Sequence, residues 1–299
     1  CAPSLDCYNR PLVRFRVDGE IIDADAEADD LAFGALPSDL DPRSALLIAP
    51  AADDADGVAV QPHLVALSMN PGQERSLGQG DLFLDRRGNL SATVRVRLGA
   101  ARTQQIRTAL RHGDDNELQR VFEQLAARIF PGAVNVHGSA IHANDPEQAL
   151  EITLRCQVPQ FMSMQPGRHE IGQLAPLLGL RPPLLSGGNR RSPMLVDSVL
   201  AESTAFHLHL PPGVSAGALP GDFALKSEFG NYAVTYSQTN GQINVTRQFD
   251  VPVQVVEPGR FTAFLDFAQQ IEQAERQQII LKIRNRTSGR NLPAKSAAE

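Results

Sequence analysis

The chain contains no tryptophan, and aromatic residues make up only 5% of its 299 residues. Surfaces that bind single-stranded nucleic acid rely on stacking side chains, so this ligand class is not expected. A formal net charge of −6 also argues against nucleic acid, because the phosphate backbone selects basic proteins. No run of about 18 apolar residues occurs, so the sequence predicts no transmembrane segment.

Cysteines and catalytic motifs are also scarce. The spacing of the three cysteines, Cys1, Cys7 and Cys156, suits neither a zinc site nor a disulfide framework. Cys156 lies in an alternating stretch and is expected to be a buried thiol. The sequence has no phosphate-binding loop and no Gly-x-Ser-x-Gly nucleophile elbow. We therefore predict no cofactor.

Short alternating segments dominate the chain and predict a β-rich α+β fold, with antiparallel sheets or sandwich-like units and a few packed helices. Asp18-Gly19 and Asn240-Gly241 are typical of tight hairpin turns. Apolar residues at steps of three and four predict helices over 115–130 and 258–276. Asp115 is the expected N-cap of the first of these helices.

Composition and periodicity divide the chain into five parts. We expect strands and an acidic loop over 1–62, an α+β unit over 63–160, a linker over 161–192, a β-rich unit with one helix over 193–284, and a flexible polar tail over 285–299.

Charge is distributed unevenly. Residues 18–56 contain twelve acidic residues and one basic residue, Arg43. A calcium loop is one interpretation of the densest part, 23–30, but the glycine and glutamate that an EF-hand requires are missing, which favours a solvated acidic loop.

Arginines dominate residues 86–111, where Arg95 and Arg97 share one face of a predicted strand. A solvated face is the simpler interpretation of this pair, and an anion site is the alternative. A calcium- or anion-binding structural module is therefore a third, weaker hypothesis for function. His207 and His209 also share a strand face, but no third ligand lies nearby, so exposed strand histidines are favoured over a metal site.

Several segments carry a family resemblance. They are Ala2 to Arg10, the strands around Asp18-Gly19 up to Asp23, Arg191 to Val196, Leu210 to Gly213, and the helix that begins near Arg260 together with the strand after it. In this pattern the chain resembles the C-terminal part of bacterial transglutaminase-like proteins, which belong to the papain-type Cys-His-Asp superfamily and carry flanking β-rich domains of unknown function. Residues 1–62 then resemble the end of the catalytic domain.

The resemblance implies a catalytic triad that this chain does not hold intact. Asp23 matches the triad aspartate, whereas Arg10 stands at the position of the triad histidine. A guanidinium stays protonated and cannot act as the base. The segment with the nucleophilic cysteine would lie upstream of the first residue. For this chain the resemblance therefore favours a pseudoenzyme or a non-catalytic fragment, with no intact catalytic site and no metal.

These expectations lead to two main hypotheses. The first is a non-catalytic accessory region that binds an unidentified protein or peptide partner in the periplasm or cell envelope, a location implied by the resemblance alone. The alternative is the C-terminal part of an active thiol acyltransferase or peptidase whose nucleophile lies upstream. Under either hypothesis a fragment boundary is favoured over a lipid anchor at Cys1.

The hairpin register gives a specific expectation for Asp23. In a tight hairpin centred on Asp18-Gly19, residue 14 lies opposite Asp23, so Arg10 needs a bulge or a longer loop to reach it. An Arg10–Asp23 ion pair would then replace the His–Asp contact of the family. The other interpretation leaves Arg10 in solvent and Asp23 in the acidic loop.

Overall fold

The computed structural model describes residues 11–27, 31–34, 36, 45–50, 60–65, 75–165, 168–172, 174, 190–196, 200–252 and 254–283. Over these residues the fold is β-rich α+β, with several antiparallel sheets and three α-helices. The predicted fold class is confirmed at this level.

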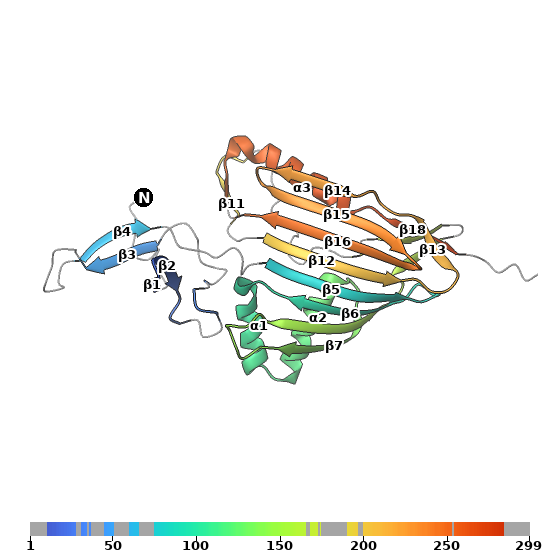
Figure 1. Ribbon diagram of the computed structural model, residues 1–299, viewed down its shortest axis with the longest axis horizontal. Coiled ribbons are helices and arrows are strands. Elements are labelled where there is room, and N and C mark those ends of the chain that lie inside the picture. The colour runs from blue at the N-terminus through green and yellow to red at the C-terminus, as the bar shows by residue number, and fades with distance from the viewer. Residues whose placement is uncertain are drawn as a thin grey trace, which may run out of the picture.

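Figure 1 shows the dominant element, a sheet of eight neighbouring strands. Their order across the sheet is β14-β15-β16-β12-β5-β6-β8-β7. In that order the strands span Phe223–Ser227, Gly230–Thr239, Gln242–Val251, Leu200–His209, Arg75–Leu84, Leu90–Arg97, Glu151–Val158 and Val134–Ile141. Every neighbouring pair is antiparallel except β12 and β5.

The parallel pair β5–β12 joins the units predicted over 63–160 and 193–284. Ala201 lies beside Arg75, and the register continues without a break to His209 beside Phe83. Backbone hydrogen bonds therefore connect two stretches that are more than 100 residues apart in sequence. The domain boundaries remain predictions, but both units contribute strands to one sheet.

The predicted linker over 161–192 begins as regular structure. Met162–Gln165 (β9) and Arg168–Ile171 (β10) form an antiparallel hairpin. β10 also pairs with β18, Ile279–Ile283, which pairs in turn with β13, Val214–Ala218. Met162 and Ile171 anchor these strands in the core. Beyond 172, only Leu174 and 190–192 of the predicted linker lie within the described residues.

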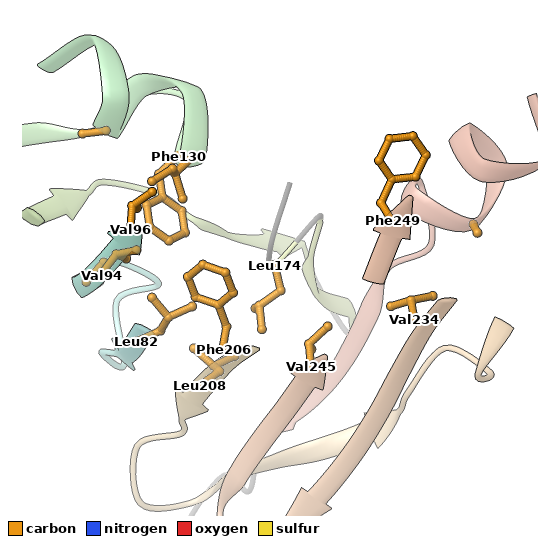
Figure 2. Packing of buried hydrophobic residues seen from close by; sticks show 14 of the residues in the cluster. Leu82, Val94, Val96, Phe130, Leu174, Phe206, Leu208, Val234, Val245 and Phe249 are labelled. Carbon is orange, nitrogen blue, oxygen red and sulfur yellow. The ribbon is translucent and has the colours of Figure 1, made fainter. Parts of the chain in front are cut away.

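Helices and the smaller sheet cover one face of the eight-stranded sheet. The helices are α1 (Ala100–His112), α2 (Asp115–Ile129) and α3 (Phe261–Glu275), the last preceded by a 3-10 turn at Pro258–Arg260. A short pair, β11 (Met194–Val196) and β17 (Gln254–Val256), adds to this layer. Figure 2 shows the core between the layers, where the rings of Phe130 and Phe206 meet edge to face with centroids 6.3 Å apart. Every second residue of the central strands faces this core, as the alternating pattern predicts.

Two local details concern α2: the residue that caps its N-terminus and the residue that allows it to pack closely on the sheet. Its N-cap is Asp114 and not the predicted Asp115, because the Asp114 carboxylate accepts a hydrogen bond from the backbone N of Glu117 at 2.8 Å. On β7, Gly138 lets the helix approach closely, since a Cβ at this position would lie 2.1 Å from Cγ of Phe122. A side chain at 138 would therefore force α2 away from the sheet.

The first described elements are two hairpins. β1 (Val13–Val17) and β2 (Glu20–Ala24) surround the predicted turn, where Asp18 and Gly19 have φ angles of 50° and 88°. Positive φ at both central residues is what a type I′ turn requires. Further along, β3 (Ala45–Pro50) pairs with β4 (Val60–Val65). Much of the acidic stretch lies outside the described residues.

Candidate functional site

Asp23, the residue at the predicted triad position, is a buried carboxylate on β2 with 2% exposure. Its partner across the hairpin is Arg14, as the register predicts. Arg14 Nε donates to Oδ1 at 2.7 Å, and Nη2 donates to Oδ2 at 2.9 Å. The hydrogen bond to Asp23 raises the pKa of the Arg14 guanidinium. Because both carboxylate oxygens are engaged, this geometry holds the two strands together.

Arg10, Cys1 and Cys7 lie outside the described residues, so the Arg10–Asp23 pair remains a prediction. Cys156 is buried on β8, as expected. Burial raises the pKa of its thiol to about 11, which leaves it protonated and unreactive at neutral pH.

The described residues also present an accessible sheet surface, the open face of the eight-stranded sheet, which we define as the face opposite the helices. Aligned polar side chains cross it in rows. One row runs over seven strands and consists of Ser237, Asn244, His207, Asp81, Thr93, Arg155 and His137. None of these residues is buried. The strand register therefore presents a broad polar surface.

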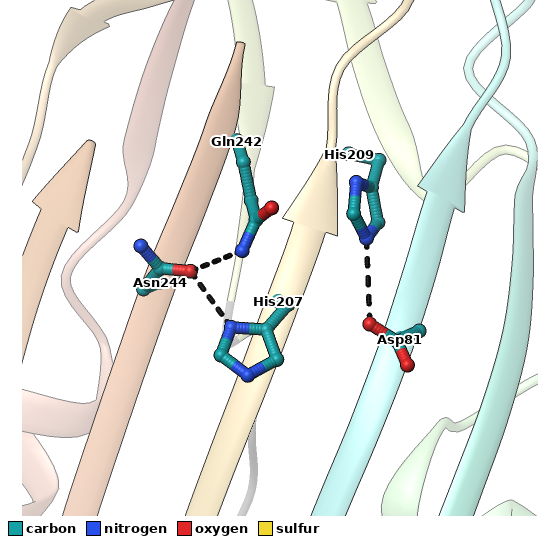
Figure 3. A network of polar contacts seen from close by, with 5 residues as sticks. All are labelled: Asp81, His207, His209, Gln242 and Asn244. Carbon is teal, nitrogen blue, oxygen red and sulfur yellow. Dashed lines mark hydrogen bonds and ion pairs between the residues drawn. The ribbon is translucent and has the colours of Figure 1, made fainter. Parts of the chain in front are cut away.

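The two predicted strand histidines lie near the centre of the open face. Figure 3 shows Asn244 Oδ1 between two groups, the Nδ1 of His207 at 2.7 Å and the amide of Gln242 at 2.5 Å. His209 Nε2 lies 3.4 Å from Asp81 Oδ1. The His209 ring also stacks on Phe83, with centroids 4.5 Å apart and planes 9° apart. The side of Phe83 that remains exposed, about half of the residue, adds an apolar spot to this polar network.

Arginines occupy the β6–β8 part of the open face. Arg95 and Arg97 on β6 and Arg155 on β8 are all exposed. Arg75 on β5 lies on the same face but forms an ion pair with Asp250. Sequence reasoning identified the shared face of Arg95 and Arg97. It missed Arg155, because strand pairing brings β8 beside β6 and no local pattern shows that pairing.

Neither a metal cluster nor a membrane-crossing helix is found in the described ranges. Among those residues, no three His, Cys, Asp or Glu side chains are grouped to hold a metal ion. None of the described helices combines the length and apolarity needed to cross a bilayer. At the described end of the acidic stretch, Asp25 accepts a hydrogen bond from the backbone N of Glu27 at 2.9 Å, which is local turn geometry.

A buried polar cluster on the covered face was not predicted. Arg247 on β16, 3% exposed, places Nε 2.5 Å from Glu275 Oε1 on α3. The Tyr232 hydroxyl donates to the same carboxylate, and burial raises the pKa of this tyrosine. One signal was available: Arg247 occupies an apolar position in the alternation of Ile243, Val245 and Phe249. The cluster ties α3 to the sheet and lies away from the open face.

Comparison with known proteins relates one part of the chain to a described domain family. No curated protein matches this chain. Residues 177–281 match a family model described as a domain of unknown function with a solved structure, DUF3858. The matched range contains the β14-β15-β16-β12 half of the large sheet and α3. The chain is thus similar to this domain family over about a third of its length, and the description of the family assigns it no activity.

Proposed function

We propose that this chain is a non-catalytic β-rich accessory region that binds a protein or peptide partner, and that the open face is its binding surface. In this proposal the large sheet and its covering layer form a sandwich-like scaffold that holds the face in place. The envelope location and the relation to transglutaminase-like proteins belong to the proposal and rest on the resemblance described above.

The observation that carries the proposal is the composition of the open face. Simple solvation of a sheet needs only polar side chains, but this face also presents unpaired guanidinium groups and the exposed Phe83–His209 stack. Exposed arginine and aromatic side chains are the types enriched in protein interfaces. The engagement of both Asp23 oxygens by Arg14 supports an architectural role for the triad position.

A peptide panel tests the binding function. Capped eight-residue peptides of acidic, neutral and basic composition are titrated against the full chain, and binding is measured by fluorescence anisotropy. We expect at least one class to bind. Gln79→Trp, in the middle of the open face, should then weaken binding by at least about tenfold, because a bulky ring obstructs a flat surface.

Ala127→Trp provides the matched control, since it adds the same ring on the solvent side of α2. It should leave binding within about twofold of the native chain. Absence of binding by every peptide class, or loss of binding in Ala127→Trp but not in Gln79→Trp, would reject the open face as the binding surface.

The non-catalytic part of the proposal has a separate test. The chain should show no thiol-dependent acyl transfer or peptide hydrolysis at neutral pH. Measurable turnover that disappears in Cys7→Ala would show that the chain is itself a thiol enzyme.

A further inference from the structure

Three guanidinium groups on the open face have no partner within the described residues. They belong to Arg95, Arg97 and Arg155, and none of them forms an ion pair or a hydrogen bond. Arg75, on the same face, is neutralised by Asp250. The three unpaired groups, which we call the arginine patch, therefore keep their full hydrogen-bonding capacity for a ligand.

Strand geometry fixes the spacing of the patch. Arg95 and Arg97 are two residues apart on β6, so their Cα atoms are separated by about 7 Å. In the β6–β8 register Arg95 lies opposite Thr153, and Arg155 lies opposite Thr93. Arg155 is therefore a diagonal neighbour of Arg95, at roughly 7–8 Å. Both separations are close to the rise of two residues in an extended chain, which is about 7 Å.

The surroundings of the patch favour a negatively charged ligand. Hydroxyl groups lie between the arginines, at Thr93 and Thr153, and His137 on β7 lies beside Arg155. Two acidic residues lie nearby in register, Glu151 opposite Arg97 and Asp81 opposite Thr93. Neither forms an ion pair with an arginine of the patch, and Asp81 lies beside His209 instead. The patch is thus a cationic area on a chain whose net charge is −6.

We propose, building on the proposed function above, that the arginine patch binds an acidic peptide segment of the partner in extended conformation. Alternate residues of such a segment repeat about every 7 Å, which matches the backbone separations of Arg95 from Arg97 and Arg155. Guanidinium groups bind carboxylates in bidentate geometry and carry charge at every physiological pH. The patch thereby sets the chemical class of the peptide that the open face selects.

The structure favours an acidic peptide over nucleic acid. β6, β7 and β8 contain no phenylalanine, tyrosine or tryptophan, so His137 is the one ring on these three strands on which a base could stack. A long polyanion would also extend beyond the patch over a chain of net negative charge. A short segment with alternating carboxylates avoids both problems.

The test uses the full chain and a labelled, capped peptide of four Glu-Thr repeats. Anisotropy titrations should show binding that weakens as salt rises, because the contacts are exposed ion pairs. The matched Gln-Thr peptide should bind at least about tenfold more weakly, and so should a peptide with four contiguous glutamates followed by four threonines, which has the same charge but the wrong spacing.

Variants locate the contacts. Arg95→Gln/Arg155→Gln should weaken binding of the Glu-Thr peptide by about tenfold or more, whereas Arg128→Gln on α2, which removes an exposed arginine from the opposite side, should change it by less than about twofold. Arg95→Glu/Arg155→Glu should instead bind a Lys-Thr peptide that the native chain does not bind. Thermal unfolding checks that each variant is folded.

Several outcomes would overturn this inference. Equal binding by the native chain and Arg95→Gln/Arg155→Gln would exclude the patch, and so would equal binding of the two glutamate peptides. Tighter binding of a single-stranded oligonucleotide than of the Glu-Thr peptide would identify a nucleic-acid surface instead. Complete competition by millimolar inorganic phosphate would show an anion site without peptide selectivity. Binding of neutral but not acidic peptides to the open face would reject this inference while preserving the proposed function.

Discussion

The two faces of the eight-stranded sheet use arginine in opposite ways. On the covered face, the Arg247 side chain is 2% exposed and its guanidinium forms an ion pair with Glu275. Arg107 on α1 is equally buried, and its guanidinium donates to backbone carbonyls of His142, Ala143, Asp145 and Gln148. On the open face, Arg95 and Arg155 have no such partners.

The difference separates residues that maintain the fold from residues that are free to bind. A buried charge must be paired, because its desolvation cost is several kcal/mol. An exposed charge costs little when it is left unpaired, so its position does not have to serve stability. Stability measurements and binding measurements should therefore respond to different arginines.

The largest effect is expected from Arg247→Ala. The substitution leaves the Glu275 carboxylate, with a side chain only 10% exposed, without this guanidinium. We expect a loss of about 3–5 kcal/mol in the free energy of unfolding, measured by urea denaturation. The double variant Arg247→Met/Glu275→Leu removes both charges and should recover part of that loss, while the buried Tyr232 hydroxyl loses its acceptor. A single variant as stable as the native chain would contradict this assignment.

Arg107→Ala should have a smaller and more local effect. Arg107 organises the loop between β7 and β8 through its backbone acceptors, for example Ala143 O at 3.1 Å and Asp145 O at 3.0 Å. Removing the guanidinium should lower the free energy of unfolding by about 2–3 kcal/mol. Water can reach only part of the loop, so it cannot replace every hydrogen bond to these carbonyl groups. Hydrogen exchange should accelerate at residues 142–148 and stay unchanged in β15 and β16. Uniform acceleration across the chain would show a global role instead.

Cys156, next to Arg155 but on the covered face, gives a pH-dependent contrast. Burial raises the pKa of this thiol from 9.0 to about 11 in the folded chain. Above pH 9 the thiol therefore ionises more readily in the unfolded chain than in the folded one. The stability contributed by the neutral thiol is fully present below pH 9 and is lost as the pH rises from 9 to 11. At pH 10 the native chain should lose about 1 kcal/mol more stability, relative to pH 8, than Cys156→Ala does. An equal loss of unfolding free energy in the two proteins between pH 8 and pH 10 would contradict a raised pKa for this thiol.

Local patterns in the sequence account for much of the fold. Asp18-Gly19 predicts the hairpin and the Arg14–Asp23 register, and the apolar steps between Leu118 and Ile129 predict α2. The pairing of β5 with β12 could not be predicted in this way. It joins strands separated by more than 100 residues, and periodicity indicates which residues of a strand are buried but not which strands are neighbours.

The candidate site follows the same division. The shared face of Arg95 and Arg97 is evident from their spacing of two, and so is that of His207 and His209. Arg155 and Asp81 join these residues only through strand order, so the patch and the central network needed the structure. Arg247 has a sequence signal, a charged residue in an apolar alternation, but only the packing of α3 shows that Glu275 neutralises it.

The smallest effect on stability is expected from Arg95→Gln, and this substitution tests the comparison most directly. Arg95 is exposed on β6 and has no ion pair to lose, so the free energy of unfolding should stay within about 0.5 kcal/mol of the native value. Gln keeps most of the aliphatic stem and a polar end, so packing on the sheet is also preserved. The Glu-Thr peptide, in contrast, should bind several-fold more weakly, because one of the matched guanidinium groups is gone. A loss of stability above about 1 kcal/mol would show that Arg95 serves the fold, as Arg247 does, and the distinction between the two faces would then fail for arginine.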